Sequence, residues 1–84
     1  MNYSLFILRR AQKELSKVPL DLYKRIKKVI FDLAKEPRPT GCKKLIEREG
    51  WRIRVGNFRI IYEIDDETNS VTILHIGHRK DVYK

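Results

Sequence analysis

The sequence has one cysteine, two histidines and no long apolar run. A single cysteine excludes an intrachain disulfide, and so few potential ligands argue against a zinc site. No apolar stretch is long enough to cross a bilayer, and the N-terminus lacks the apolar segment of a signal peptide. We therefore expect a cytoplasmic globular protein with no metal or other cofactor and no segment that spans a membrane.

Acidic residues are also scarce, with 11 Asp and Glu against 19 Lys and Arg, so the formal net charge is +8. The 84 residues predict one domain, residues 1–84, with little room for an internal cofactor. A basic excess of this size favours nucleic acid, an anionic membrane surface or an acidic protein as partner. Solubility alone is the plainest alternative. The placement of the charges along the chain must distinguish between these partners and solubility alone.

The hydrophobic periodicity changes once along the chain and predicts the order β-α-α-β-β-β. The apolar opening at 3–8 predicts a short strand, and apolar residues recur at helical spacing over 11–18 and 23–33, on either side of Pro19. Residues 37–41 form a loop by their prolines and glycine. Alternating runs over 51–64 and a β-rich run at 71–76 follow. The order predicts an α+β fold, in which an antiparallel helical hairpin packs on one face of a mainly antiparallel sheet.

The dipeptide Gly56-Asn57 lies between two alternating runs and predicts a two-residue hairpin turn of type II′. That turn sets Val55 opposite Phe58 and Arg54 opposite Arg59. Opposed residues share a sheet face, so the hairpin has one apolar face, which the helices must cover. This apolar face consists of Trp51, Ile53, Val55, Phe58, Ile60 and Tyr62. The other face carries Arg52, Arg54 and Arg59.

Two opposed arginines, Arg54 and Arg59, destabilise a hairpin, and such conflicts are expected at functional sites. Guanidinium groups at fixed separation suit phosphate oxygens. The alternative is an ordinary solvated face, on which Glu63 pairs with Arg52 or Arg54. We expect an anion site.

The C-terminal segment gathers polar residues that suit RNA chemistry: His75, His78, Arg79, Lys80 and Tyr83. A regular strand places His75 on the same face as Val71 and Ile73. Gly77 would let the chain turn, so that His78, Arg79 and Tyr83 bend over the sheet. The alternative is that Val82 and Tyr83 only anchor the terminus while the charges stay in solvent.

Two segments together carry a family resemblance. WRIRVGNFRIIYEI at 51–64 and LHIGHRKDVY at 74–83 resemble the RelE/ParE superfamily of bacterial and archaeal toxins. The resemblance implies the toxin of a type II toxin–antitoxin system, inhibited by a small RelB-like antitoxin that wraps it. RelE-like members enter the ribosomal A site and cleave bound mRNA. The implied chemistry is metal-independent attack of the RNA 2′-hydroxyl on the adjacent phosphate, leaving a 2′,3′-cyclic phosphate.

The resemblance also implies roles for single residues. Arg52 and Arg54 match basic positions of the first hairpin strand, and Arg59 matches the arginine on the scissile phosphate. Arg79 matches the C-terminal arginine of the family, which would stabilise the charge of the transition state or of the leaving group. Tyr83 matches the C-terminal tyrosine, which would orient the nucleotide or stack on it. Arginine is a poor general base, so His78 is our candidate for that role and His75 is less favoured.

Further RNA contacts, to mRNA or ribosomal RNA, are assigned to basic and histidine side chains: Lys24, Lys28, Lys43, Lys44, His75 and Lys80. We expect the antitoxin to be acidic and to fold as it binds. Two other functions stay open: a ParE-like inhibitor of DNA gyrase without nuclease chemistry, and an inactive basic RNA-binding module.

Overall fold

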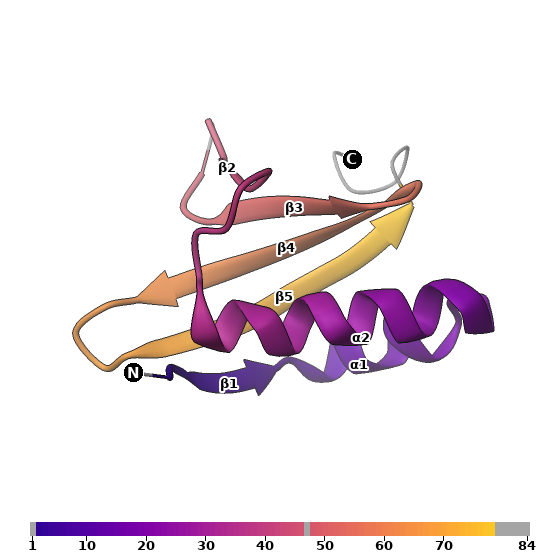
Figure 1. The fold of residues 1–84 in the computed structure, drawn as a ribbon, viewed down its shortest axis with the longest axis horizontal. Helices are drawn as coiled ribbons and strands as arrows, with labels where there is room; N and C mark the ends of the chain where they lie inside the picture. Colours follow the sequence, from indigo (N-terminus) through magenta and orange to yellow (C-terminus); the bar gives the residue numbers. More distant parts are fainter. Residues whose placement is uncertain (1, 47, 79–84) are drawn as a thin grey trace.

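The structure, a computed structural model, describes residues 2–46 and 48–78. Two helices and five strands follow one another along the chain (Figure 1). In order they are β1 (Ser4–Ile7), α1 (Arg9–Ser16), α2 (Leu20–Lys35), β2 (Lys43–Lys44), β3 (Trp51–Val55), β4 (Phe58–Asp65) and β5 (Ser70–His78).

The strands form one sheet in the order β1-β5-β4-β3-β2. β1 pairs in parallel with β5, and every other pair is antiparallel. The predicted α+β class is therefore confirmed. Strand β2 was not predicted, because two lysines show no periodicity. It forms on the free edge of β3, where the Leu45 N–H also donates to the Gly50 carbonyl at 3.0 Å.

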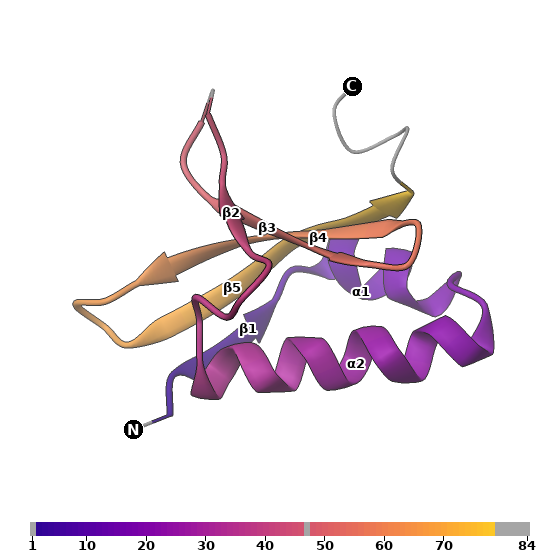
Figure 2. The same ribbon diagram turned by 45° about the horizontal axis from the view of Figure 1, so that its top comes forward.

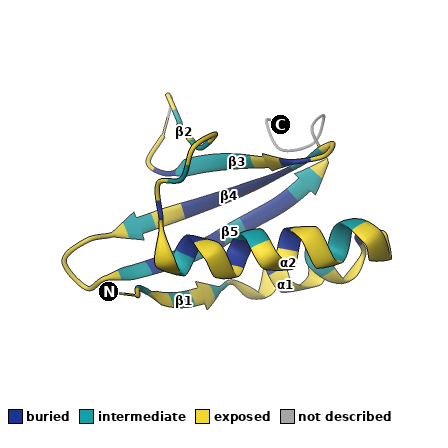
Figure 3. Ribbon diagram, in the orientation of Figure 1, coloured by how far each residue is buried: buried dark blue, intermediate teal, exposed yellow. Residues whose placement is uncertain are grey.

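Helix α2 covers one face of the sheet (Figure 2). The apolar stripe that the sequence predicts faces the core. Ile26, Ile30 and Leu33 are buried, while the lysines of this helix face solvent (Figure 3). Pro19 precedes the first helical residue, a position at which its missing N–H costs nothing. Helix α1 is shorter, buries Ala11 and packs beside β5.

The β3–β4 hairpin has the predicted register. Val55 pairs with Phe58, Arg54 with Arg59 and Trp51 with Tyr62. Gly56 has a φ of 60°, the left-handed value that a type II′ turn needs at its first central position. The apolar face of the hairpin packs into the core, as predicted.

Tyr62 joins the sheet to the loop after α2. Its ring is fully buried and its hydroxyl donates to the Pro37 carbonyl at 2.8 Å. Burial raises the pKa of the Tyr62 phenol well above its usual value. The loop is held a second time where the Arg38 guanidinium lies 5.2 Å from the centre of the Trp51 ring.

Tyr62→Phe is expected to lower the free energy of unfolding by about 1 kcal/mol at pH 7, because one buried hydrogen bond is lost. The wild type should lose further stability above about pH 10, where an unfolded tyrosine ionises and the buried one does not. That alkaline loss should be smaller in the variant. Urea unfolding between pH 7 and 11 measures both effects, with Tyr23→Phe on α2 as the control. Equal alkaline losses in wild type and Tyr62→Phe would contradict the prediction.

Candidate functional site

Arg52, Arg54 and Arg59 lie on the face of the sheet that α2 does not cover, which we call the arginine face. Pairing across four strands builds one row of this face from Lys43, Arg52, Ile61 and His75. The adjacent row contains Arg54, Arg59 and Gly77. Neighbouring strands are about 4.8 Å apart, so the three arginines form a compact cationic cluster.

The three arginines differ in exposure. Arg54 is exposed and Arg52 is half-buried, whereas only 8% of Arg59 is exposed. Among the described residues, no carboxylate lies within ion-pair distance of Arg52 or Arg54. Glu63, the expected partner on an ordinary solvated face, makes no such pair with them. The exposed end of the cluster is therefore available to an anion, and partial burial strengthens that attraction.

A β-bulge decides which face His75 occupies. The register between β4 and β5 shifts between Ile61 and Tyr62, because Ile61 pairs with His75 but Tyr62 pairs with Ile73. The extra residue, Leu74, breaks the alternation. Val71 and Ile73 are therefore in the core, while His75 lies on the arginine face. The expectation that His75 shares a face with Val71 and Ile73 is wrong, because it assumed a regular strand.

His78 lies on the opposite face from Arg59. Strand β5 runs through Gly77 to His78 without the expected turn. His78 pairs with Phe58, a residue of the apolar face, and their rings meet edge to face with centroids 5.7 Å apart. Arg59 instead pairs with Gly77. His78 therefore projects away from the arginine cluster.

Glu14 on α1 ties the helix to the end of β5. One carboxylate oxygen, Oε1, accepts from the Ile76 N–H at 2.9 Å. The other, Oε2, lies 2.6 Å from Nδ1 of His75 and 3.3 Å from Nε of Arg10. The sequence offered no signal for Glu14, because helical spacing shows only that it lies off the apolar stripe.

The family assignment rests on the whole chain. A sequence model described as "ParE toxin of type II toxin-antitoxin system, parDE" matches residues 5–83. The chain belongs to this toxin family. Toxin RelG of Mycobacterium tuberculosis is 34% identical over 86 residues, which cover 100% of this chain and 99% of the relative.

Solved structures of related toxins share the fold. The toxin–antitoxin complex RelBE2 of Mycobacterium tuberculosis matches with a TM-score of 0.82 at 30% identity, covering 94% of this chain and 100% of that one. The archaeal RelE–RelB complex of Pyrococcus horikoshii OT3 matches with a TM-score of 0.84 at 26% identity, covering 98% and 100%. The RelE-like fold is thereby confirmed, and the protein is a toxin of a type II toxin–antitoxin system in the RelE/ParE superfamily.

The other predicted RNA contacts of this toxin do not form one surface. Lys43 shares the row of Arg52, whereas Lys44 pairs with Trp51 and has the opposite orientation. Lys24 and Lys28 are exposed on α2, on the far side of the sheet, and Lys28 pairs with Asp32 at 3.1 Å. Arg79, Lys80 and Tyr83 lie outside the described residues.

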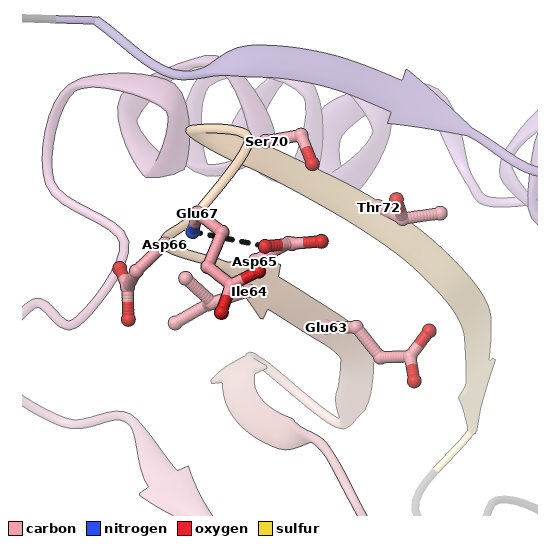
Figure 4. A pocket seen from close by; sticks show the side chains of 7 residues that line it. All are labelled: Glu63, Ile64, Asp65, Asp66, Glu67, Ser70 and Thr72. Carbon is pink, nitrogen blue, oxygen red and sulfur yellow. Dashed lines mark hydrogen bonds between the residues drawn. The ribbon is translucent and has the colours of Figure 1, made fainter.

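The end of the sheet at the β4–β5 turn, away from the arginine face, is acidic. A hollow of about 550 Å³ at the β4–β5 turn is lined mainly by acidic and hydroxyl side chains (Figure 4). The lining residues are Glu63, Ile64, Asp65, Asp66, Glu67, Ser70 and Thr72. Arg38 binds Asp66 at 2.9 Å and holds the pKa of that carboxyl below its usual value. Its carboxylates repel phosphate, so this hollow is not an RNA site. It is also remote from the arginine face, because Asp65 lies about 20 Å along β4 from Arg59.

Two structural observations concern metals and membranes. Within residues 2–46 and 48–78, no three His, Cys, Asp or Glu side chains are grouped so that they would hold a metal ion. Neither α1 nor α2 is long and apolar enough to span a bilayer.

Proposed function

We propose that this toxin is a ribosome-dependent endoribonuclease that cleaves mRNA in the A site. The observation that carries the proposal is the arginine face, where Arg52, Arg54 and Arg59 converge and the first two have no carboxylate partner among the described residues. A phosphate in this cluster meets guanidinium donors from two adjacent strands. Such a site suits a reaction in which negative charge builds up on phosphorus-bound oxygens.

The proposed reaction is attack of the RNA 2′-oxygen on the adjacent phosphorus, with departure of the 5′-oxygen and no metal ion. Arg59 holds the scissile phosphate, while Arg52 and Arg54 stabilise the charge of the transition state. Arg79 and Tyr83 keep the roles that the family resemblance implies, in charge stabilisation and nucleotide stacking. The ribosome supplies alignment of the 2′-hydroxyl, and alignment alone contributes much of the barrier reduction.

The proposed partners are ribosomal RNA and mRNA, and a small RelB-like antitoxin that silences the toxin in the cytoplasm. Two of the related structures described above are complexes of a toxin with an antitoxin. The net charge of +8 favours acidic antitoxin residues over the arginine face. Lys43 extends this face by one strand and is a further proposed contact.

A second candidate function is inhibition of DNA gyrase, which the match to the ParE family model favours. To distinguish mRNA cleavage from gyrase inhibition, purified toxin is incubated with programmed ribosomes and, in parallel, with gyrase and supercoiled DNA. We expect position-specific mRNA cuts with 2′,3′-cyclic phosphate ends, mapped by primer extension. Intact mRNA together with inhibited gyrase would refute the nuclease proposal.

A further inference from the structure

One end of β5 brings a histidine and a carboxylate close together on the arginine face. Nδ1 of His75 is fully buried and lies 2.6 Å from Oε2 of Glu14, off the direction of a linear hydrogen bond. The Glu14 carboxylate is fixed independently by the Ile76 N–H and by Arg10. A negative oxygen beside Nδ1 favours the tautomer with its proton there, which leaves Nε2 as a proton acceptor.

The bulge at Leu74 places this histidine where the proposed chemistry needs a base. His75 shares its row with Arg52, and Arg59 lies diagonally across β4. Of the His75 side chain, 11% is exposed, and the buried Nδ1 is not part of that fraction. Bulges often reorient a side chain beside an active site. A regular strand would have turned His75 into the core.

We infer that His75 is the proton acceptor of the cleavage step and that Glu14 is its positioning residue. The inference rests on the proposed nuclease function. It assigns to His75 the role for which the family resemblance suggested His78, whose side chain lies on the other face. His75 is thus more than a surface contact to RNA.

Nε2 of neutral His75 takes the proton of the 2′-hydroxyl while the 2′-oxygen forms its bond to phosphorus. The bond between phosphorus and the 5′-oxygen breaks, and the 5′-oxygen takes a proton from water. The Glu14 carboxylate stabilises the imidazolium, which then returns its proton to solvent.

Among the residues that the structure describes, two neighbouring elements bring charged groups near His75. Helix α1 contributes Glu14 and Arg10, and β4 contributes Arg59. Strand β1, the other neighbour of β5, has no charged residue in Ser4–Ile7. A proton acceptor works only in its unprotonated form, so the proposed step predicts slower cleavage in acid.

His75→Asn is the principal test, because the asparagine amide can occupy the Nδ1 position beside Glu14 but cannot accept the proton of the 2′-hydroxyl. We expect the single-turnover cleavage rate on ribosomes to fall by about 10²-fold, with ribosome binding and thermal unfolding close to wild type. The acid limb of the rate between pH 5.5 and 8.5 should be absent from this variant and present in His78→Asn.

Glu14→Gln keeps an acceptor for the Ile76 N–H and removes the charge beside Nδ1. We expect cleavage to fall by about 10-fold, whereas Glu67→Gln, the same change in the exposed β4–β5 turn, should leave it unchanged. A wild-type cleavage rate that does not change with pH overturns the inference, even if the variants misfold. An acid limb that is lost in His78→Asn but kept in His75→Asn overturns it as well. Wild-type toxin that leaves mRNA intact refutes the nuclease proposal itself.

Discussion

Replacing Arg52 and Arg54 together by glutamine is expected to lower the single-turnover rate of mRNA cleavage by about 10³-fold, because two cationic donors to the transition state are lost. Both side chains lie at the accessible end of the arginine face, and neither has a carboxylate partner among the described residues. Their loss should leave the fold intact, since the hairpin loses the repulsion between Arg54 and Arg59. Primer extension on programmed ribosomes measures the rate, and urea unfolding checks the fold.

The matched control replaces Arg9 and Lys35 by glutamine. Both residues are exposed on helices, and each double variant lowers the formal net charge by two, from +8 to +6. If the arginine face binds the scissile phosphate, only the Arg52 and Arg54 variant should lose cleavage. Equal losses in the two variants would show that overall charge, and not this cluster, governs activity.

Association of the toxin with its antitoxin is expected to slow by one to two orders of magnitude as salt rises from about 50 to 500 mM. The physical reason is that a basic surface steers an acidic partner at long range, and salt shortens that range to a few ångströms. The dissociation rate should change much less, because apolar contacts resist screening. Stopped-flow mixing of the two purified proteins measures both rates.

The Arg52 and Arg54 variant also localises this effect. Its association with the antitoxin should show a shallower salt dependence than that of the Arg9 and Lys35 control, if acidic antitoxin residues cover the arginine face. Association that does not respond to salt would contradict an acidic antitoxin, whatever the outcome of the cleavage assay.

The hairpin was predictable because its information is local. Gly56-Asn57 fixes the turn, the turn fixes the register, and side-chain alternation then assigns each residue to a face. Arg54 therefore lies opposite Arg59 without the help of any tertiary contact. Helical periodicity is local in the same way, and it predicted that Ile26, Ile30 and Leu33 form the stripe of α2 that meets the core.

The surroundings of β5 were not predictable in this way. The bulge at Leu74 is a feature of the pairing between β5 and β4, and no turn residue marks it in the sequence. One extra residue was enough to place His75 on the opposite face from Ile73, which stays in the core. The straight course of β5 through Gly77 likewise turned His78 away from the cluster to which the family resemblance had assigned it.

The family, the fold class and the arginine face were predictable because each depends on short-range spacing or on motifs of consecutive residues. The face that His75 occupies and its contact with Glu14, 61 positions away in the chain (75 − 14), depend instead on long-range packing. A contact between residues so distant in sequence is created by the packing of α1 on β5. Periodicity within either element carries no information about it.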